Sequence, residues 1–126
     1  MENKVELKWD KGNIIFNLNG TRTAKELIKV LPLEAKAQLW GEEVYFSVPL
    51  ESELEQGREI LEIGDIAYWP PGNAFCIFFG ITPASTDNRP RAAGPVTVIG
   101  RLACIRDSEK LKKIKQGQKV SLKLKK

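Results

Sequence analysis

Aromatic and proline residues are the side chains of this sequence best suited to contact a ligand. Trp69 is followed directly by Pro70 and Pro71, and Trp40 and Tyr45 precede them in the chain. Aromatic rings that flank a proline turn commonly hold an extended peptide or a small molecule in an apolar cleft. The alternative is that the tryptophans are core residues, which is the usual place of single aromatic side chains in a small domain.

Arginine, serine and acidic residues offer further candidates. Arg89 and Arg91 lie in a proline-rich segment and could bind a carboxylate or a phosphate through paired hydrogen bonds, or could be solvated loop residues. The Ser-Thr-Asp segment at residues 85–87 has no neighbouring base, which argues against nucleophilic catalysis there. The acidic stretch 51–62 lacks the pattern of a calcium loop, so we interpret it as solvated surface.

The chain contains no histidine and only two cysteines, Cys76 and Cys104. A histidine-dependent nucleophile, a histidine general base and a histidine-containing zinc site are therefore excluded. We predict no catalytic residues, no metal site and no cofactor. Because both cysteines lie in apolar segments of strand character, we expect two buried, reduced thiols.

The formal charge of +4 is unevenly distributed along the chain. Eight lysines and no acidic residues follow position 109, and the preceding part carries 12 basic and 16 acidic residues, a balance of −4. We interpret the lysines as the solvated face of a helix and of a final edge strand, where lysine prevents edge-to-edge pairing. Nucleic acid is not an expected partner, because the lysine-rich segment lacks arginine clusters and interleaved aromatic rings.

The length of 126 residues and the hydrophobic fraction of 42% fit a single domain over residues 1–126. The longest apolar run, Ala74–Phe79, is too short to cross a membrane. Met1–Val5 lacks the basic start and apolar stretch of a signal peptide, so we expect a cytoplasmic protein. The composition is compatible with a monomer or a small homo-oligomer.

The positions of apolar residues indicate which elements carry these side chains. Alternation predicts a β-hairpin at residues 5–18, and Thr23 and Glu26 have the spacing of a capping box in front of a helical repeat. A short helix is therefore expected over residues 23–31. The run 74–79 is apolar without alternation, which predicts a core strand covered on both faces.

Short strands separated by turn signals dominate the rest of the chain. Residues 84–95 are expected to form a long loop that interrupts the strands. The fold class predicted from this order is mostly β, a closed antiparallel barrel of about eight strands with two short helices. Further strands are expected at residues 33–39, 44–48, 58–63, 64–69, 96–102 and 120–124, with the second helix near residues 108–115.

Several segments in this order resemble the cyclophilin fold, specifically the small stand-alone cyclophilin-like proteins of prokaryotes. Residues 21–27 resemble the segment that opens the first cyclophilin helix, and residues 64–74 carry the most specific likeness. The runs at 74–79, 98–102 and 120–125 resemble later strands of the same fold. The resemblance covers almost the whole chain and implies a cyclophilin-like barrel with a ligand cleft.

True cyclophilins place in this cleft an arginine that steadies the twisted prolyl amide, with glutamine, phenylalanine and asparagine around it. The resemblance puts the arginine position on or near Trp40, where no cation stands, and leaves Tyr45 as the pocket aromatic. It therefore implies a binding module for a peptide or small molecule that lacks the catalytic arginine; the alternative is a weak or atypical prolyl isomerase. The ligand-binding residues expected are Trp40, Tyr45, Trp69, Pro70, Pro71, Phe75 and Arg89.

Overall fold

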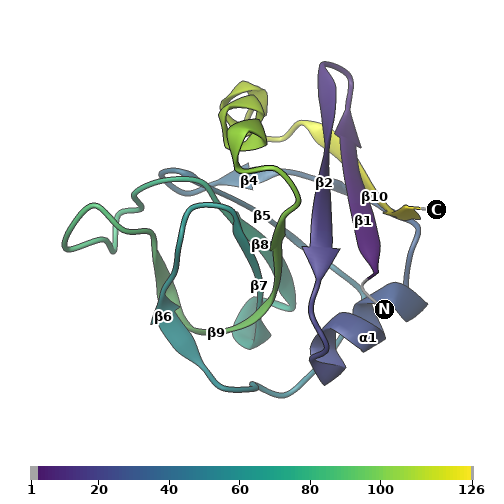
Figure 1. The fold of residues 1–126 in the computed structure, drawn as a ribbon, viewed down its shortest axis with the longest axis horizontal. Helices are drawn as coiled ribbons and strands as arrows, with labels where there is room; N and C mark the ends of the chain where they lie inside the picture. The colour runs from purple at the N-terminus through teal and green to yellow at the C-terminus, as the bar shows by residue number, and fades with distance from the viewer. Residues whose placement is uncertain (1–2, 126) are drawn as a thin grey trace.

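The computed structural model describes residues 3–125, so expectations that rest on Met1, Glu2 or Lys126 lie outside the described residues. Strands dominate the described chain, with one α-helix and two 3₁₀ segments between them (Figure 1). In chain order the elements are β1 (Lys4–Trp9), β2 (Gly12–Leu18), α1 (Arg22–Lys29), β3 (Leu33–Lys36), β4 (Gln38–Leu39), β5 (Glu43–Ser47), β6 (Arg58–Ile60), β7 (Asp65–Trp69), η1 (Pro70–Gly72), β8 (Ala74–Phe78), β9 (Arg91–Leu102), η2 (Ile105–Lys113) and β10 (Lys119–Lys125).

The strands form one antiparallel sheet of ten members, where about eight were expected. Nine of them follow the order β3-β10-β1-β2-β9-β7-β8-β5-β4, and β6 pairs with β9 beside this path. The mostly β, antiparallel fold class is confirmed, but hydrogen bonds do not close the sheet into a barrel. The end strands β3 and β4 are consecutive in the chain and separated only by Ala37, so they cannot pair with each other. The run 33–39 instead pairs with β10 at one end and with β5 at the other.

The lysine-rich strand β10 is not an edge strand, and that expectation was wrong. It lies between β1 and β3 and pairs with both. Two of its lysines make ion pairs with carboxylates of these neighbouring strands, Lys119 with Glu34 at 3.2 Å and Lys123 with Glu6 at 3.6 Å. Lys119 and Lys123 therefore pair with carboxylates across the sheet, and β10 has no free edge for its lysines to protect.

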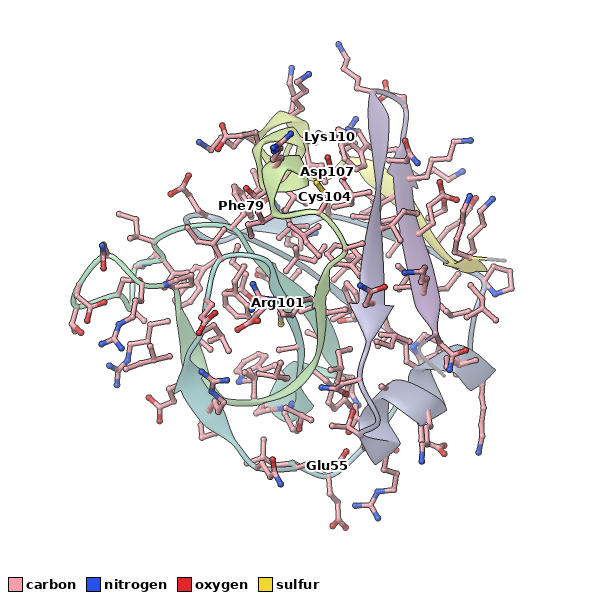
Figure 2. All side chains as sticks on the ribbon, in the orientation of Figure 1. Glu55, Phe79, Arg101, Cys104, Asp107 and Lys110 are labelled. Carbon is pink, nitrogen blue, oxygen red and sulfur yellow. The ribbon has the colours of Figure 1, made fainter. Side chains whose placement is uncertain are left out.

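Helix α1 begins where two oxygen acceptors meet its free backbone N–H groups. Thr21 is the N-cap and its hydroxyl accepts from the Ala24 N–H at 3.1 Å. The Glu55 carboxylate accepts from the Thr23 N–H at 2.8 Å and from the Thr23 hydroxyl at 2.6 Å. These hydrogen bonds lower the pKa of Glu55. Glu55 thus fastens the acidic loop to the start of the helix (Figure 2), where free solvation was expected for the whole stretch.

The second helical segment, η2, is a 3₁₀ run over residues 105–113, slightly earlier than the expected 108–115. Figure 1 shows η2 and α1 at opposite ends of the β1–β2 hairpin. Leu111 of η2 and Leu27 of α1 both pack into the main core, so each segment covers one end of the strands. Among residues 3–125, no helix is long and apolar enough to cross a membrane.

Strand β9 begins at Arg91, although residues up to Pro95 were expected to be loop. The expectation failed because Gly94 and Pro95 are poor strand formers by local preference. Here β6 pairs with this part of β9, with Ile60 opposite Arg91 and Arg58 opposite Val96 across a register shift. The connection to β9 is therefore shorter than expected and projects from the side of the molecule away from β1 and α1 (Figure 1).

Apolar side chains form two separate clusters, one on each face of the sheet. The main core contains Phe16, Phe46 and Phe75, with ring centroids 5.3 Å apart for Phe46–Phe75 and 6.3 Å apart for Phe16–Phe75. The second cluster lies on the other face of β7 and β8 and is closed by Leu61 and the first half of β9. All five residues of β8 are buried, as the unbroken apolar run predicted.

Gly100 lies where β9 pairs with β2, opposite Leu18. A Cβ at this position would overlap the Asn17 carbonyl oxygen and lie 3.0 Å from the Leu18 Cα. We expect Gly100→Ala to lower the free energy of unfolding by about 1–3 kcal/mol, because the two backbones must separate. Urea denaturation measures this change.

Gly20→Ala is the matched control, since nothing lies within 4 Å of a Cβ there and Gly20 is not among the glycines with positive φ. Its free energy of unfolding should stay equal to that of the wild type or rise by up to about 1 kcal/mol. Equal stability of the two variants would contradict the close approach of β2 and β9.

Candidate functional site

The alternation of side chains along β5 separates the main core from the second face of the sheet. Val44 and Phe46 point into the main core, so Glu43 and Tyr45 lie on the opposite face. Tyr45 pairs with Cys76 of β8, and Cys76 pairs in turn with Ala67 of β7. A row of side chains from three strands therefore shares one face next to the second cluster.

A tight turn between β4 and β5 places Trp40 beside Glu43. The two residues exchange backbone hydrogen bonds of 3.0 and 3.2 Å, which makes them direct cross-strand partners with side chains on the same face. Gly41 in the turn has φ +59°, and a Cβ there would lie 2.8 Å from the Thr82 Cα. Glycine at 41 thus permits the turn that sets the indole of Trp40 next to a carboxyl group.

Trp69 ends β7 and is held by the 3₁₀ turn that follows it. Pro70 occupies the start of this turn, where a missing N–H is tolerated. A Cβ on Gly72 would lie 2.9 Å from the six-membered ring of Trp69, so glycine lets the indole lie flat against the turn. Asn73, with φ 48°, then leads into β8, and its side chain donates to the Leu50 carbonyl oxygen at 2.8 Å.

These side chains surround a cavity of about 230 Å³. The turn after β4 and strands β5, β7 and β8 contribute to its lining, together with the first half of β9. Glu43 is the one carboxylate among the described residues that line it, and no lysine or arginine does. The lining residues are Trp40, Glu43, Tyr45, Trp69, Cys76, Ala92, Ala93 and Val96.

Glu43 is the chemically unusual residue of this cavity. Its side chain is only 5% exposed, and burial raises the pKa of Glu43 to about 7. The neighbouring Cys76 thiol opposes this rise in pKa, and no basic side chain contributes. The same burial, together with the nearby carboxylate, raises the pKa of the Cys76 thiol well above its usual range. Glu43 can therefore exchange a proton near neutral pH, whereas Cys76 stays a thiol and is not a nucleophile.

Three of the predicted binding residues, Trp40, Tyr45 and Trp69, lie together in the cavity wall. Phe75 does not join them: it is 1% exposed in the main core, because its neighbours Ala74 and Cys76 take the cavity side of β8. The remaining predicted residues lie outside the described lining. Pro70 and Pro71 form the turn behind Trp69, and Arg89 is held on the surface by Asp87 at 2.7 Å.

Sequence reasoning missed Glu43, which stands in a segment that has the composition of a solvated turn. A signal was available in its spacing, since Glu43 and Tyr45 are two residues apart in a strand and share a face. Ala92, Ala93 and Val96 were missed because that segment was expected to be loop.

The two cysteines differ in environment. Cys76 is buried, as expected, but Cys104 is exposed, and the expectation for Cys104 was wrong. Cys104 lies between β9 and η2, directly before the first residue of η2 (Figure 2). Both thiols are unbridged. Within residues 3–125, no three His, Cys, Asp or Glu side chains lie close enough together to hold a metal ion.

Comparison with known proteins assigns the architecture to one family. A family described as cyclophilin-like matches residues 3–123. The solution structure of a hypothetical protein from Archaeoglobus fulgidus superposes with a TM-score of 0.80 and 34% sequence identity, covering 97% of this chain and 94% of that one. None of the curated proteins matches the chain.

The raised pKa of Glu43 makes the stability of the fold depend on pH. Between about pH 4.5 and about pH 7 the folded state binds more protons than the unfolded state. The contribution of protonated Glu43 to the free energy of unfolding is therefore complete below this pH window and is lost as the pH rises through it. A pKa difference of this size corresponds to roughly 3 kcal/mol. At pH 8 we expect Glu43→Gln to unfold with a free energy about 1–3 kcal/mol higher than the wild type, and the difference should vanish near pH 4.5.

Urea denaturation at pH 4.5, 6 and 8 measures this dependence. Glu53→Gln is the matched control, because Glu53 is exposed and its variant should follow the wild-type curve at each pH. Parallel pH profiles for wild type and Glu43→Gln would show that Glu43 is not desolvated.

Native protein should react with a thiol reagent at one cysteine only. Cys104 is exposed and should label rapidly at pH 8, whereas buried Cys76 should label only on unfolding. Mass spectrometry after a short exposure identifies the labelled residue, and Cys104→Ser should leave the native protein unlabelled. Equal labelling rates at the two cysteines would contradict the closed packing around Cys76.

Proposed function

The chain belongs to the cyclophilin-like family, and from this premise we propose that it is a non-enzymatic binding protein that holds a small organic molecule in the cavity beside Glu43. The observation that carries the proposal is a buried carboxyl group without a basic partner in a cavity of otherwise apolar and aromatic walls. Sites of this kind, apolar with one placed polar group, are typical of small-ligand pockets.

The energetic argument starts from the cost of burying Glu43. A carboxyl group that loses water without gaining a partner lowers the stability of the fold. A glutamine or a methionine at this position would avoid that loss. Ionisable groups with perturbed pKa values are common at functional sites, because the burial that lowers stability also prepares the group to bind or react.

The size of the cavity favours a small molecule over an extended peptide. A closed apolar cavity of about 150 Å³ is large enough for benzene. The cavity beside Glu43, at about 230 Å³, therefore has room for one ring with a short substituent. The small side chains of Ala92 and Ala93 leave this space open on the β9 side, and larger residues at these positions would fill it.

The residues that line the cavity also argue against prolyl isomerase chemistry. The twisted prolyl amide needs a fixed donor, and no lysine or arginine lines the cavity among the described residues. Two arginines of β6 and β9 are engaged outside the cavity: Arg58 donates to the Ile60 carbonyl oxygen at 3.2 Å and Arg101 pairs with Asp65 at 3.0 Å.

We expect isomerase activity on a proline peptide to be absent, or at least about a hundredfold below that of a true cyclophilin, because the electrostatic donor is missing. A protease-coupled peptide assay measures this. Strong activity that is lost in Arg58→Ala would overturn the expectation and identify Arg58 as the donor.

Binding to the cavity is tested with three single-ring probes of different charge: benzylamine, benzyl alcohol and benzoate. Tryptophan fluorescence and calorimetry report binding, since Trp40 and Trp69 line the cavity. Ala93→Phe should weaken the best probe at least tenfold, because its ring fills the space that the probe needs. Ala93 is exposed at the rim, so this variant leaves both apolar clusters intact.

Ala103→Phe is the matched control: Ala103 is also exposed and does not line the cavity. It should bind every probe as the wild type does. Absence of binding by all three probes at millimolar concentration, or binding that Ala93→Phe leaves unchanged, would overturn the proposed function.

A further inference from the structure

We propose that the ligand is a small organic ammonium ion, whose charge pairs with Glu43 and whose apolar body packs against Trp40, Tyr45 and Trp69. This inference rests on the proposed function and names the chemical class that the cavity selects. Its basis is the combination of one buried carboxyl group with three aromatic side chains in the same wall. Aromatic faces attract cations, and a carboxylate supplies the opposite charge that a desolvated ammonium requires.

The unused hydrogen-bonding capacity and the charge of the Glu43 carboxyl group determine which ligand fits. Glu43 has no ion pair among the described residues, and the thiol of its polar neighbour Cys76 donates to the Ala74 carbonyl oxygen at 3.8 Å. The two oxygens of a carboxylate can accept several hydrogen bonds. An ammonium N–H would satisfy that capacity, whereas an anionic ligand would meet repulsion and a neutral hydroxyl would supply one donor.

The charge around the cavity favours the same class of ligand. All the residues that line the cavity lie within residues 38–96. This segment carries nine acidic side chains and three arginines, a formal charge of −6, with no lysine. Two of the arginines are paired, Arg89 with Asp87 at 2.7 Å and Arg91 with Glu59 at 3.1 Å. Arg101, from outside the segment, pairs with Glu62 at 3.3 Å and with Asp65 at 3.0 Å. The segment keeps a net negative charge although the whole chain is positive, and a negative balance favours cations over anions.

The titratable groups that face Glu43 are few. Tyr45 on its own strand and Cys76 on β8 line the cavity. The remaining lining residues do not titrate: Trp40 in the turn before β5, Trp69 of β7, and Ala92, Ala93 and Val96 of β9. A pH dependence of ammonium binding near neutrality therefore reports Glu43. Since burial raises the pKa of Glu43 to about 7, the carboxylate that pairs with the cation is scarce at pH 5.5 and predominant at pH 8.

Benzylamine and benzyl alcohol form a matched pair of probes, because they differ in one polar atom and in charge. By calorimetry at pH 8 we expect benzylamine to bind wild-type protein at least tenfold more tightly than benzyl alcohol. Its affinity should fall about tenfold or more between pH 8 and pH 5.5. In Glu43→Gln the preference for the amine and its pH dependence should both disappear, while Glu42→Gln should behave as the wild type.

Each outcome separates this inference from the proposed function. If benzyl alcohol or benzoate binds as well as benzylamine and Ala93→Phe blocks it, the cavity binds small molecules but the ammonium inference is wrong. If benzylamine is preferred equally in wild type and Glu43→Gln, the cation is held elsewhere and the inference is also wrong. If no probe binds wild type, both fail.

Discussion

The burial of β8 on both faces is the constraint on which the rest of the structure depends. A five-residue strand without an exposed side chain needs one apolar layer on each side of the sheet. Phe75 and Ile77 belong to the main core, and Cys76 and Phe78 belong to the second cluster. The second layer is covered by Leu61, which follows β6, and by Ala92 and Val96 of β9. The cavity lies where this thin cover stops short of Trp40 and Tyr45.

The sequence indicated this constraint but not how it is met. The unbroken apolar run from Ala74 predicted a strand covered on both faces, and the resemblance to cyclophilins placed Trp40, Tyr45 and Trp69 near one cleft. Which face of the sheet each residue takes depends on the alternation along its strand. Phe75 faces the main core because its neighbours face the other side, and this assignment requires the boundaries and partners of the strand. The start of β9 was not predicted because Gly94 and Pro95 are poor strand formers, whereas in the structure pairing with β6 outweighs this local preference.

Glu43 shows why charged residues are the hardest part of a site to predict. Glu42 and Glu43 have the same side chain in the same turn, yet only Glu43 is buried in the cavity wall. The difference comes from the Trp40–Glu43 backbone pairing and from Gly41, whose positive φ sets the direction of the turn. Local composition predicts a solvated turn for both glutamates, so the distinction depends on contacts between elements distant in sequence.

The pairing of β1 with β10 has a consequence for how the chain folds. Lys4 lies opposite Lys125 and Lys8 opposite Ser121, so this ladder of the sheet joins segments more than a hundred residues apart. Closing a loop of that length costs conformational entropy before any contact repays it, and proteins dominated by such distant pairings fold on a scale of roughly milliseconds to seconds. During synthesis on the ribosome, β1 and β2 would have to wait as an isolated hairpin for most of the chain, and a two-stranded hairpin alone is only marginally stable in water.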